Sequence, residues 1–416
     1  MSSPLEEYAD MVYRCIRCGA CRAVCPTFGE ELSEVAVARG RVALVEAVMA
    51  GTLPLTPVFE RTVFGCAMCG ACKAGCPSGV DVPGIIEAAR AELVRRKGSE
   101  PLARYLAKKS LKDKGALDRA FSLMAMGRAM YGPLAATPLS RYLPYQYKDF
   151  KRSFPKIPSR PFHKRVPALS PAENARGRVV FYAGCVINYV YPEIGEAAVF
   201  VLNRAGYDVL TVGDELCCGK PLISLGETGA FTALAGKTLA QLAGLEADYV
   251  LTACPTCALT LKEDYPKILS GSDDAARLAV KVEDVGRFLL NKSDVIKKLS
   301  ASEVSVTYHD PCHLNFGMGV HAEPRELLKA ATGGGLVEMA DAERCCGFGG
   351  SFSFLNYRLS GQIAARKARN AGATGAALVA AGCPGCMMHI ADALSQAHVK
   401  ARAMHTLQVI AMALKT

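Results

Sequence analysis

The sequence predicts a mixed protein of the α+β and α/β classes, with a helical N-terminal module followed by two copies of a parallel α/β unit. The first observation behind this prediction is the distribution of the eighteen cysteines. They fall into two short runs before residue 77 and two longer, repeated sets after residue 184. The second observation is the alternation of short apolar runs with helical stretches in both repeated sets, which is typical of parallel sheets.

Composition indicates the class of protein to which this 416-residue chain belongs. Half of its residues are hydrophobic, so packed domains are expected, and no apolar run approaches the roughly 18–20 residues that a membrane-spanning helix needs. The first ten residues are polar and acidic, unlike a signal peptide. Because CxxC spacings in a long chain without a signal peptide favour metal over disulfides, we expect a cytoplasmic protein. A complex would at most attach it peripherally to the inner face of the cytoplasmic membrane.

A first domain is predicted over residues 1–100. A helix is expected from Arg39 to Ala50, where valines recur near helical spacing and Gly51 follows. A second helix is expected after Asp81, with Pro83 in its first turn and Gly98 at its end.

Residues 101–176 are predicted to form a basic, proline-containing linker. The net charge of the chain is +10, and lysines and arginines between residues 104 and 178 supply much of the excess. Such a segment is either a solvated connector or a docking surface for a partner subunit or lipid headgroups. The docking interpretation draws on six aromatic residues, Tyr131, Tyr142, Tyr145, Tyr147, Phe150 and Phe154. No nucleic-acid-binding motif accompanies the charge, so no nucleic-acid partner is expected.

Two repeated domains are predicted over residues 177–299 and 300–416, because equivalent cysteines recur roughly 128 positions apart. In the first copy we expect strands over 179–183, 208–212 and 249–253 and helices over 193–204 and 228–243. In the second copy we expect strands over 304–308, 335–339 and 377–381 and helices over 323–331 and 360–371. The cysteines follow the strands, and ligands gather at the carboxyl ends of parallel strands. Each copy should therefore bring its cysteines to one metal site.

Both N-terminal cysteine runs follow the pattern CxxCxxCxxxCP, from Cys15 to Pro26 and from Cys66 to Pro77. The pattern resembles the runs that hold cubane 4Fe–4S clusters in bacterial ferredoxins, in which the fourth cysteine of each run binds the other cluster. The resemblance implies one cubane on Cys15, Cys18, Cys21 and Cys76 and a second on Cys66, Cys69, Cys72 and Cys25. Structural zinc is the alternative, although such sites use four ligands in paired spacing.

The ten remaining cysteines form two copies of a rarer pattern, a single cysteine followed by Cys-Cys-Gly and then CxxC. The copies are Cys185, Cys217, Cys218, Cys254 and Cys257, and Cys312, Cys345, Cys346, Cys383 and Cys386. A CxxC motif alone is ambiguous between zinc, a dithiol redox pair and iron–sulfur. An adjacent Cys-Cys pair does not suit one tetrahedral zinc ion, whereas two neighbouring sulfurs can ligate different irons of one cluster. A vicinal disulfide is the remaining alternative. Helices expected after Gly219 and Cys257 would point their positive ends at an anionic cluster.

This C-terminal pattern is similar to the CCG domains of heterodisulfide reductases, which bind non-cubane 4Fe–4S clusters. Two such domains behind a two-cluster ferredoxin module resemble the iron–sulfur subunits of glycolate oxidase, of related lactate dehydrogenases and of anaerobic glycerol-3-phosphate dehydrogenase. Pro26-Thr27-Phe28 followed by Ala38-Arg39-Gly40-Arg41 is closest to the glycolate oxidase type, and the stretch from Gly184 to Gly219 equally resembles the glycerol-3-phosphate type. The resemblance implies one or two non-cubane clusters besides the two cubanes.

Four further residues are candidates to act beside the clusters. His309 and His313 flank Cys312; they either bond to cluster sulfur or carry protons, or else they cap or fill the core. His389 lies one helical turn after Cys386 and has the same two interpretations. Lys220 follows the first Cys-Cys-Gly and either offsets cluster charge or is an exposed lysine. No strand–GxGxxG–helix unit occurs, so neither flavin nor nicotinamide is expected to bind this chain.

The absence of a hydride-accepting motif decides between function classes. Iron–sulfur clusters carry single electrons, whereas oxidation of a 2-hydroxy acid removes two electrons at a flavin or nicotinamide. The resemblance therefore implies the iron–sulfur electron-transfer subunit of a flavoprotein glycolate or lactate dehydrogenase, part of an oxidoreductase but without activity alone. Expected partners are an FAD-binding dehydrogenase subunit and a membrane quinone-reducing subunit or electron-transfer flavoprotein. The alternatives are a heterodisulfide-reductase-like subunit that reduces a disulfide or quinone at a non-cubane cluster, and a glycerol-3-phosphate dehydrogenase iron–sulfur subunit.

Overall fold

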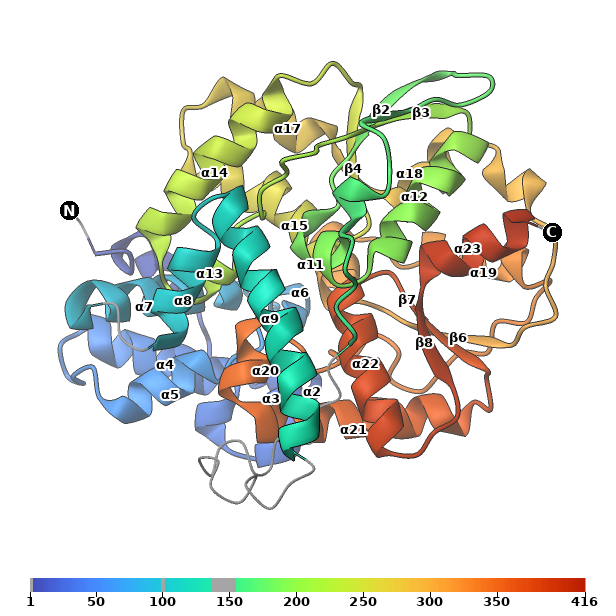
Figure 1. Cartoon of the computed structure of the whole chain (residues 1–416). Helices are drawn as coiled ribbons and strands as arrows, with labels where there is room; N and C mark the ends of the chain where they lie inside the picture. Colours follow the sequence, from blue (N-terminus) through green and yellow to red (C-terminus); the bar gives the residue numbers. More distant parts are fainter. Residues whose placement is uncertain (1–2, 99–101, 136–154, 416) are drawn as a thin grey trace.

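The computed structural model describes residues 3–98, 102–135 and 155–415. Figure 1 shows a helical N-terminal module beside two α/β units, with the first C-terminal unit above the second in that view. The mixed class and the largely parallel sheets confirm the predicted architecture. Within the described residues, no helix is both long enough and apolar enough to cross a bilayer.

The N-terminal module consists of short helices around two longer ones. Its elements are η1 (Glu6–Tyr8), α1 (Ala9–Tyr13), α2 (Cys21–Val24), α3 (Pro26–Glu31), η2 (Glu34–Ala36), α4 (Ala38–Met49), α5 (Pro57–Phe64), α6 (Ala71–Ala74) and α7 (Val82–Lys97). Helices α4 and α7 confirm the two predicted helices. The Asp81 side chain caps α7 by accepting the Gly84 N–H at 3.2 Å, as the sequence suggests for a helix with proline in its first turn. Val45, Ile85 and Ile86 are fully buried between these helices.

The predicted linker contains two helices that the sequence analysis did not identify, α8 (Leu102–Ser110) and α9 (Lys114–Ala135). It then contributes η4 (Phe162–Lys164) and β1 (Leu169–Ser170) to the first α/β unit. The Phe162 ring is buried there, edge-on to Phe181 at 5.7 Å between ring centroids.

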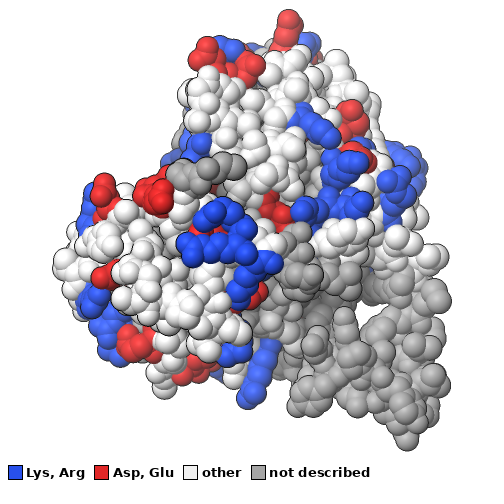
Figure 2. Space-filling view, turned by 90° about the vertical axis from the view of Figure 1, so that its left-hand side faces the viewer, with Lys and Arg blue, Asp and Glu red and all other residues white. Residues whose placement is uncertain are grey.

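The aromatic residues expected to form a docking surface from Tyr142 to Phe154 lie outside the described residues. Figure 2 shows basic side chains in several groups with acidic ones nearby, on the side that faces left in Figure 1.

The first α/β unit has a five-stranded sheet in the order β1-β3-β2-β4-β5. Its remaining strands are β2 (Gly177–Phe181), β3 (Tyr207–Thr211), β4 (Tyr249–Thr252) and β5 (Val282–Asp284), which are mutually parallel, while β1 pairs antiparallel with β3. The helices are α11 (Gly184–Tyr189), α12 (Pro192–Arg204), α13 (Lys220–Ser224), α14 (Thr228–Ala243), α15 (Pro255–Leu259), η5 (Thr260–Asp264), α16 (Tyr265–Ile268), α17 (Asp273–Lys281), α18 (Val285–Lys292) and η6 (Val295–Lys298). All three predicted strands and both predicted helices are present.

The second unit repeats this arrangement with a three-stranded parallel sheet, β6 (Val306–His309), β7 (Leu378–Ala381) and β8 (Arg402–His405). Its helices are η7 (His313–Gly317), α19 (Glu323–Ala331), α20 (Ser351–Leu355), α21 (Tyr357–Ala373), α22 (Pro384–Gln396) and α23 (Thr406–Lys415). Helix α12 packs against α23, and the equivalent pair α18 and α19 also packs together. The two copies therefore face each other through corresponding helices, as a duplicated fold allows.

The predicted strand over 335–339 is wrong. Only Leu336 forms a bridge, to Val306, and the chain leaves the sheet after the Val337 N–H donates to the Val306 carbonyl at 2.8 Å. Gly333 and Gly334 adopt φ of 57° and 92° and form a left-handed turn. Because of this turn, the chain comes alongside β6 only near Leu336. Beyond the bridge, Arg325 binds the Glu338 carboxylate at 2.7 Å, away from the sheet ladder.

Candidate iron–sulfur centres

The N-terminal module encloses two neighbouring hollows whose walls carry its eight cysteines. One hollow is lined by Cys15, Cys18, Cys21 and Cys76, and the other by Cys25, Cys66 and Cys69, while Cys72 lines both. We call the first hollow site A and the second site B. Cys25 lies in the wall of site B although it follows Cys21 closely in sequence, and Cys76 lies in site A. The arrangement matches the exchange of fourth cysteines that the ferredoxin resemblance implies.

The two cysteine runs share an unusual backbone. Arg17 and Met68, each just before the second cysteine of its run, have φ of 56° and 58°. Gly19 and Gly70, each just after that cysteine, have φ of 86° and 78°. Left-handed backbone at a non-glycine residue costs energy and is concentrated at functional sites, and turns of this kind direct N–H groups toward anions. The backbone of both hollows is therefore suited to an anionic group.

Sites A and B differ in access to solvent. Cys18 of site A is exposed, and the neighbouring Tyr13 and Ile16 side chains are 62% and 68% exposed. In site B, Cys25 and Cys69 are buried. Site A is thus the N-terminal centre that a partner molecule can approach.

Two buried arginines hold the backbone around site B. The Arg41 guanidinium donates to the carbonyl oxygens of Thr62 and Gly65 at 3.0 and 2.8 Å. Arg90 donates to the Cys66 carbonyl at 2.8 Å and, across to the first α/β unit, to the Ser224 carbonyl at 2.9 Å. Burial lowers the pKa of Arg90 to about 10, so it remains a cation at neutral pH, beside a site that would carry negative charge.

The five cysteines of the first repeat meet at the carboxyl ends of β2 and β4, and we call this cluster of thiols site C. The Sγ atoms of Cys185 and Cys217 lie 3.7 Å apart, and Cys218 interacts with both Cys217 and Cys257. Cys254 immediately precedes α15 and interacts with Cys257 in the first turn of that helix. Helix α13 begins after Gly219 as expected, whereas α15 begins after Cys254 and contains Cys257.

A buried carboxylate shapes the loop that carries Cys185. Glu215 accepts the N–H groups of Ala183 and Gly184 at 2.8 and 2.6 Å. Burial raises the pKa of Glu215 to about 8 against the opposing effect of these hydrogen bonds. Gly184 has no room for a side chain, because a Cβ atom there would lie 2.8 Å from the Cys257 Sγ. The loop is therefore fitted closely around the thiols.

The second repeat builds site D in the same way. The Sγ atoms of Cys346 and Cys386 lie 3.3 Å apart, Cys345 interacts with Cys312, and Cys383 interacts with Cys386. The side chain of Cys345 lowers the pKa of Cys346, just as Cys217 lowers that of Cys218.

Cysteines of sites B, D and C lie close enough to interact electrostatically with those of a neighbouring site. The Cys69 thiol of site B interacts with Cys345 of site D, and Cys383 of site D interacts with Cys254 of site C. The loop after Cys346 approaches the site B loop so closely that a Cβ atom on Gly349 would lie 2.9 Å from the Ala67 carbonyl oxygen. Neighbouring sites therefore lie close together in a series A–B–D–C: Cys72 lines both A and B, Cys69 is near Cys345, and Cys383 is near Cys254.

His313 lies at the junction of three of these sites. Its Nε2–H donates to the Met68 carbonyl of the site B loop at 3.2 Å, because a carbonyl only accepts. Nδ1 then accepts from the Thr256 hydroxyl, between the two cysteines of the site C CxxC motif, at 2.9 Å. Both ring nitrogens are therefore used in joining the three loops, and His313 stands beside Cys312 of site D.

The other polar candidates have distinct surroundings. His389 is buried, and its Nε2 lies 3.0 Å from the Ser360 hydroxyl in a core setting near site D. His309 is fully buried at the end of β6 and points toward two site D cysteines. Lys220 is not an exposed lysine. Its Nζ contacts Glu87 of α7 at 2.7 Å and Asp264 at 2.9 Å, and its side chain is 14% exposed.

The donor sets fit iron–sulfur clusters better than single metal ions. All eighteen cysteines are described, and none of them forms a disulfide. Sites C and D each gather five thiols, one more than a tetrahedral zinc ion accepts. Arg90, Glu215 and Thr256 also shape the sites but were not predicted from the sequence. Glu215 and Thr256 lie beside or within a cysteine motif, whereas Arg90 lies in α7 away from any motif, and each acts through contacts between segments distant in sequence.

Comparison with known families agrees with this division of the chain. Residues 11–80 match the 4Fe-4S dicluster domain, and residues 179–262 and 306–391 each match CCG, a cysteine-rich domain. The dicluster match covers the cysteine runs of sites A and B, and the two CCG matches cover the cysteines of sites C and D.

Several curated proteins are similar over most of their length. The probable glycolate oxidase iron-sulfur subunit of Bacillus subtilis is 29% identical over 408 residues, covering 94% of this chain and 91% of that protein. A subunit of the dihydromethanophenazine:CoB–CoM heterodisulfide reductase of Methanosarcina acetivorans is 28% identical, covering 91% of this chain and 88% of that protein. Lactate utilization protein A of Oceanobacillus iheyensis is 30% identical, covering 56% of this chain and 96% of its own length. Among solved structures, a hypothetical protein from Helicobacter pylori aligns with a TM-score of 0.53 at 10% identity, covering 99% of this chain and 76% of that one, which indicates a shared fold.

Proposed function

Because the chain belongs to the family of CCG-domain iron–sulfur proteins that includes lactate utilization protein A, we propose that it is the electron-transfer subunit of a 2-hydroxyacid dehydrogenase complex. The relatives are named as iron–sulfur subunits or redox proteins of several oxidoreductases, among them a probable glycolate oxidase. Glycolate and lactate are therefore the first substrates to consider for the complex.

The cysteines of the four sites are assigned to four clusters. Cys15, Cys18, Cys21 and Cys76 hold one cubane in site A, and Cys66, Cys69, Cys72 and Cys25 hold the second in site B. The five thiols of site C and the five of site D each hold a non-cubane 4Fe–4S cluster. These groups supply one-electron transfer, while the two-electron oxidation of the substrate belongs to a flavin on a partner subunit.

One observation carries the proposal, the series of contacts A–B–D–C. It leads from Cys18 at the surface, through the neighbouring pairs Cys69–Cys345 and Cys383–Cys254, whose thiols interact electrostatically, to the buried thiols of site C. A protein that stored clusters independently would not need its sites in contact. A protein that passes single electrons does, because electron transfer between carriers requires close approach. The order assigned to the clusters is therefore A, B, D, C.

Site A is the point of exchange with the flavoprotein partner. It has the exposed Cys18, and the exposed apolar side chains of Tyr13 and Ile16 lie beside it, as is common where a redox partner docks. An FAD-binding dehydrogenase would deliver electrons there. A quinone-reducing subunit or electron-transfer flavoprotein would receive them from the opposite end of the series, at sites C and D.

The proposal is tested by mixing anaerobic, cluster-loaded protein with the flavoprotein that copurifies with it and adding glycolate or lactate. The chain alone should not respond to either acid, because its sequence contains no flavin- or nicotinamide-binding motif to supply a hydride acceptor. With the flavoprotein present, the cluster absorbance should bleach within the turnover time of the complex. Failure of every such pair to bleach the clusters would contradict the proposed function.

Direct reduction of a disulfide is the second candidate. The observation in its favour is that both CCG copies retain all five cysteines and meet at the Cys254–Cys383 contact, as would suit chemistry shared between two clusters. Under this alternative, chemically reduced protein would be reoxidised at catalytic rates by a small disulfide, and replacing Cys218 or Cys346 would abolish that turnover. Reoxidation by a disulfide, together with no response to a hydroxy acid and flavoprotein, would favour this candidate.

A further inference from the structure

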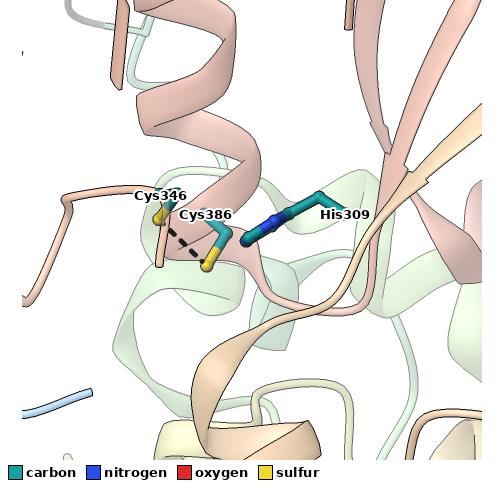
Figure 3. A group of neighbouring side chains, drawn as sticks. All are labelled: His309, Cys346 and Cys386. Carbon is teal, nitrogen blue, oxygen red and sulfur yellow. Dashed lines mark hydrogen bonds between the residues drawn. The ribbon is translucent and has the colours of Figure 1, made fainter. Parts of the chain in front are cut away.

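His309 ends strand β6 and places its imidazole in the wall of site D. The residue is fully buried. Figure 3 shows its ring directed toward Cys346 and Cys386, whose sulfurs face each other across the site. Cys346 lies in the loop between α19 and α20, and Cys386 lies in the first turn of α22, so three separate segments bring these side chains together.

Hydrogen bonding fixes which ring nitrogen is available. Nδ1 lies 3.1 Å from the Ala342 carbonyl oxygen, and because a carbonyl only accepts, Nδ1 carries the proton. Nε2 of the neutral ring is then a lone-pair donor for a metal. It is fully buried and has no hydrogen-bond partner among the described residues. A buried, unpaired polar atom is costly, so a ligand for this nitrogen is expected.

The separations match ligands that share one metal atom. The two sulfurs are 3.3 Å apart, and a ring nitrogen of His309 and both sulfurs lie within 4.8 Å of one another. Two ligands at about 2.0–2.3 Å from one metal lie at most about 4.6 Å apart. A small adjustment of side chains is enough to bring all three onto one iron.

The first repeat provides an internal comparison. Tyr182 follows β2 at the position that corresponds to His309, since Cys185 corresponds to Cys312. Its hydroxyl donates to the Leu216 carbonyl at 2.7 Å, so it has no unpaired atom directed at site C. The buried His405 is also engaged: its Nε2–H donates to the Ala253 carbonyl at 3.0 Å, and its Nδ1 accepts the Leu407 N–H at 3.2 Å. The unpaired buried nitrogen is therefore a feature of site D.

We propose that His309 Nε2 is a ligand to an iron of the site D cluster, the iron that Cys346 and Cys386 also bind. This proposal rests on the cluster assignment of the proposed function. It makes the two repeated clusters chemically different, with five thiolates in site C and five thiolates plus a neutral imidazole in site D. Imidazole ligands give iron–sulfur clusters a higher reduction potential than thiolates in the same position, so the site D potential should fall when cysteine replaces His309.

Pulsed electron paramagnetic resonance on full-length protein labelled with ¹⁵N-histidine tests the assignment. Directly bonded nitrogen gives a large hyperfine coupling, and nitrogen that only donates a hydrogen bond to sulfur gives a small one. Wild-type protein should show one strongly coupled histidine nitrogen. His309→Phe should lose it, and Tyr182→Phe, the matched change in the first repeat, should retain it. His309→Cys should lose the coupling while keeping the iron content, because a thiolate replaces the imidazole, and it should lower the site D potential.

The outcomes separate this inference from the cluster assignment. Iron content near 16 atoms per chain, roughly four for each of four clusters, establishes that site D is loaded. With that iron content, a small coupling, or a large coupling that survives in both His309 variants, would overturn the ligand assignment and leave the proposed function standing. Iron content near 12 with an empty site D would instead overturn the cluster assignment and, with it, the role of His309.

Discussion

Removing the Lys220 ammonium group should destabilise the contact between the N-terminal module and the first CCG domain. Lys220 Nζ is held between the Glu87 carboxylate of α7 and the Asp264 carboxylate, whose side chains are 13% and 15% exposed. Burial opposes the lysine charge, but the two carboxylates outweigh it and raise the pKa of Lys220. Lys220→Met leaves both carboxylates buried without a cation.

Breaking a buried ion pair in this way costs about 3–5 kcal/mol. At a urea m value of about 3 kcal/mol per M, that loss lowers the unfolding midpoint by roughly 1 M or more. Anaerobic urea titration followed at the cluster absorbance measures the shift. The control is Lys73→Met, which removes a half-exposed ion pair with Asp81 and should cost about 0–1 kcal/mol.

Low pH and removal of the two carboxylates should each offset the loss of Lys220. Burial already raises the pKa of Asp264 to about 6, and loss of Lys220 should raise this pKa further. The Lys220→Met variant should therefore regain stability as pH falls through the raised pKa of Asp264, because the protonated carboxyl group no longer needs a cation. Replacing Glu87 and Asp264 by leucine together with Lys220→Met should restore most of the stability, because no buried charge then remains. An unchanged midpoint for Lys220→Met would refute the argument that this lysine joins the two domains.

Three further predictions concern the metal content, the crossed cysteines and a buried acid. Protein purified anaerobically should contain roughly 16 irons and no stoichiometric zinc, whereas about 8 irons would mean that sites C and D are empty. Cys25→Ala should damage the cubane of Cys66, Cys69 and Cys72, seen by electron paramagnetic resonance, and damage to the Cys18 cubane instead would exclude crossed ligation. Burial raises the pKa of Asp284 to about 7, so the contribution of this acid to stability is full below about pH 4 and is lost as pH rises through 7. Asp284→Asn should therefore flatten the plot of unfolding free energy against pH between about pH 4 and 7. An unaltered slope in this range would contradict the prediction.

Local sequence signals predicted the elements that hold each cysteine set. Helix α7 begins after its Asp81 cap, and β4 and β7 lead directly into CxxC, because capping, apolar runs and ligand spacing are all short-range properties. The apolar residues after Gly335 also read as a strand, but preceding glycines and an ion pair to Glu338 allow only one bridge. Tertiary interactions override a local pattern there.

Relations between the sites could not be predicted from the same signals. Cys69 and Cys345 meet because the CCG loop of the second copy docks on the ferredoxin-like loop, and neither loop encodes that docking by its spacing. The sequence allows Lys220 either to offset cluster charge or to be exposed, and the structure instead buries it against carboxylates from two domains. For His309 the sequence leaves open a role beside the cluster or in the core, and only the unpaired Nε2 distinguishes them.

Removing the middle of the series tests the electron relay most directly. Cys66→Ser combined with Cys72→Ser takes two ligands from site B and leaves the ten CCG cysteines intact. In wild-type protein, the flavoprotein partner and its hydroxy acid should reduce all clusters. In the variant, rapid-freeze electron paramagnetic resonance should show the site A cluster reduced while the clusters of sites D and C stay oxidised. Reduction of those two clusters at the wild-type rate would contradict the order A, B, D, C.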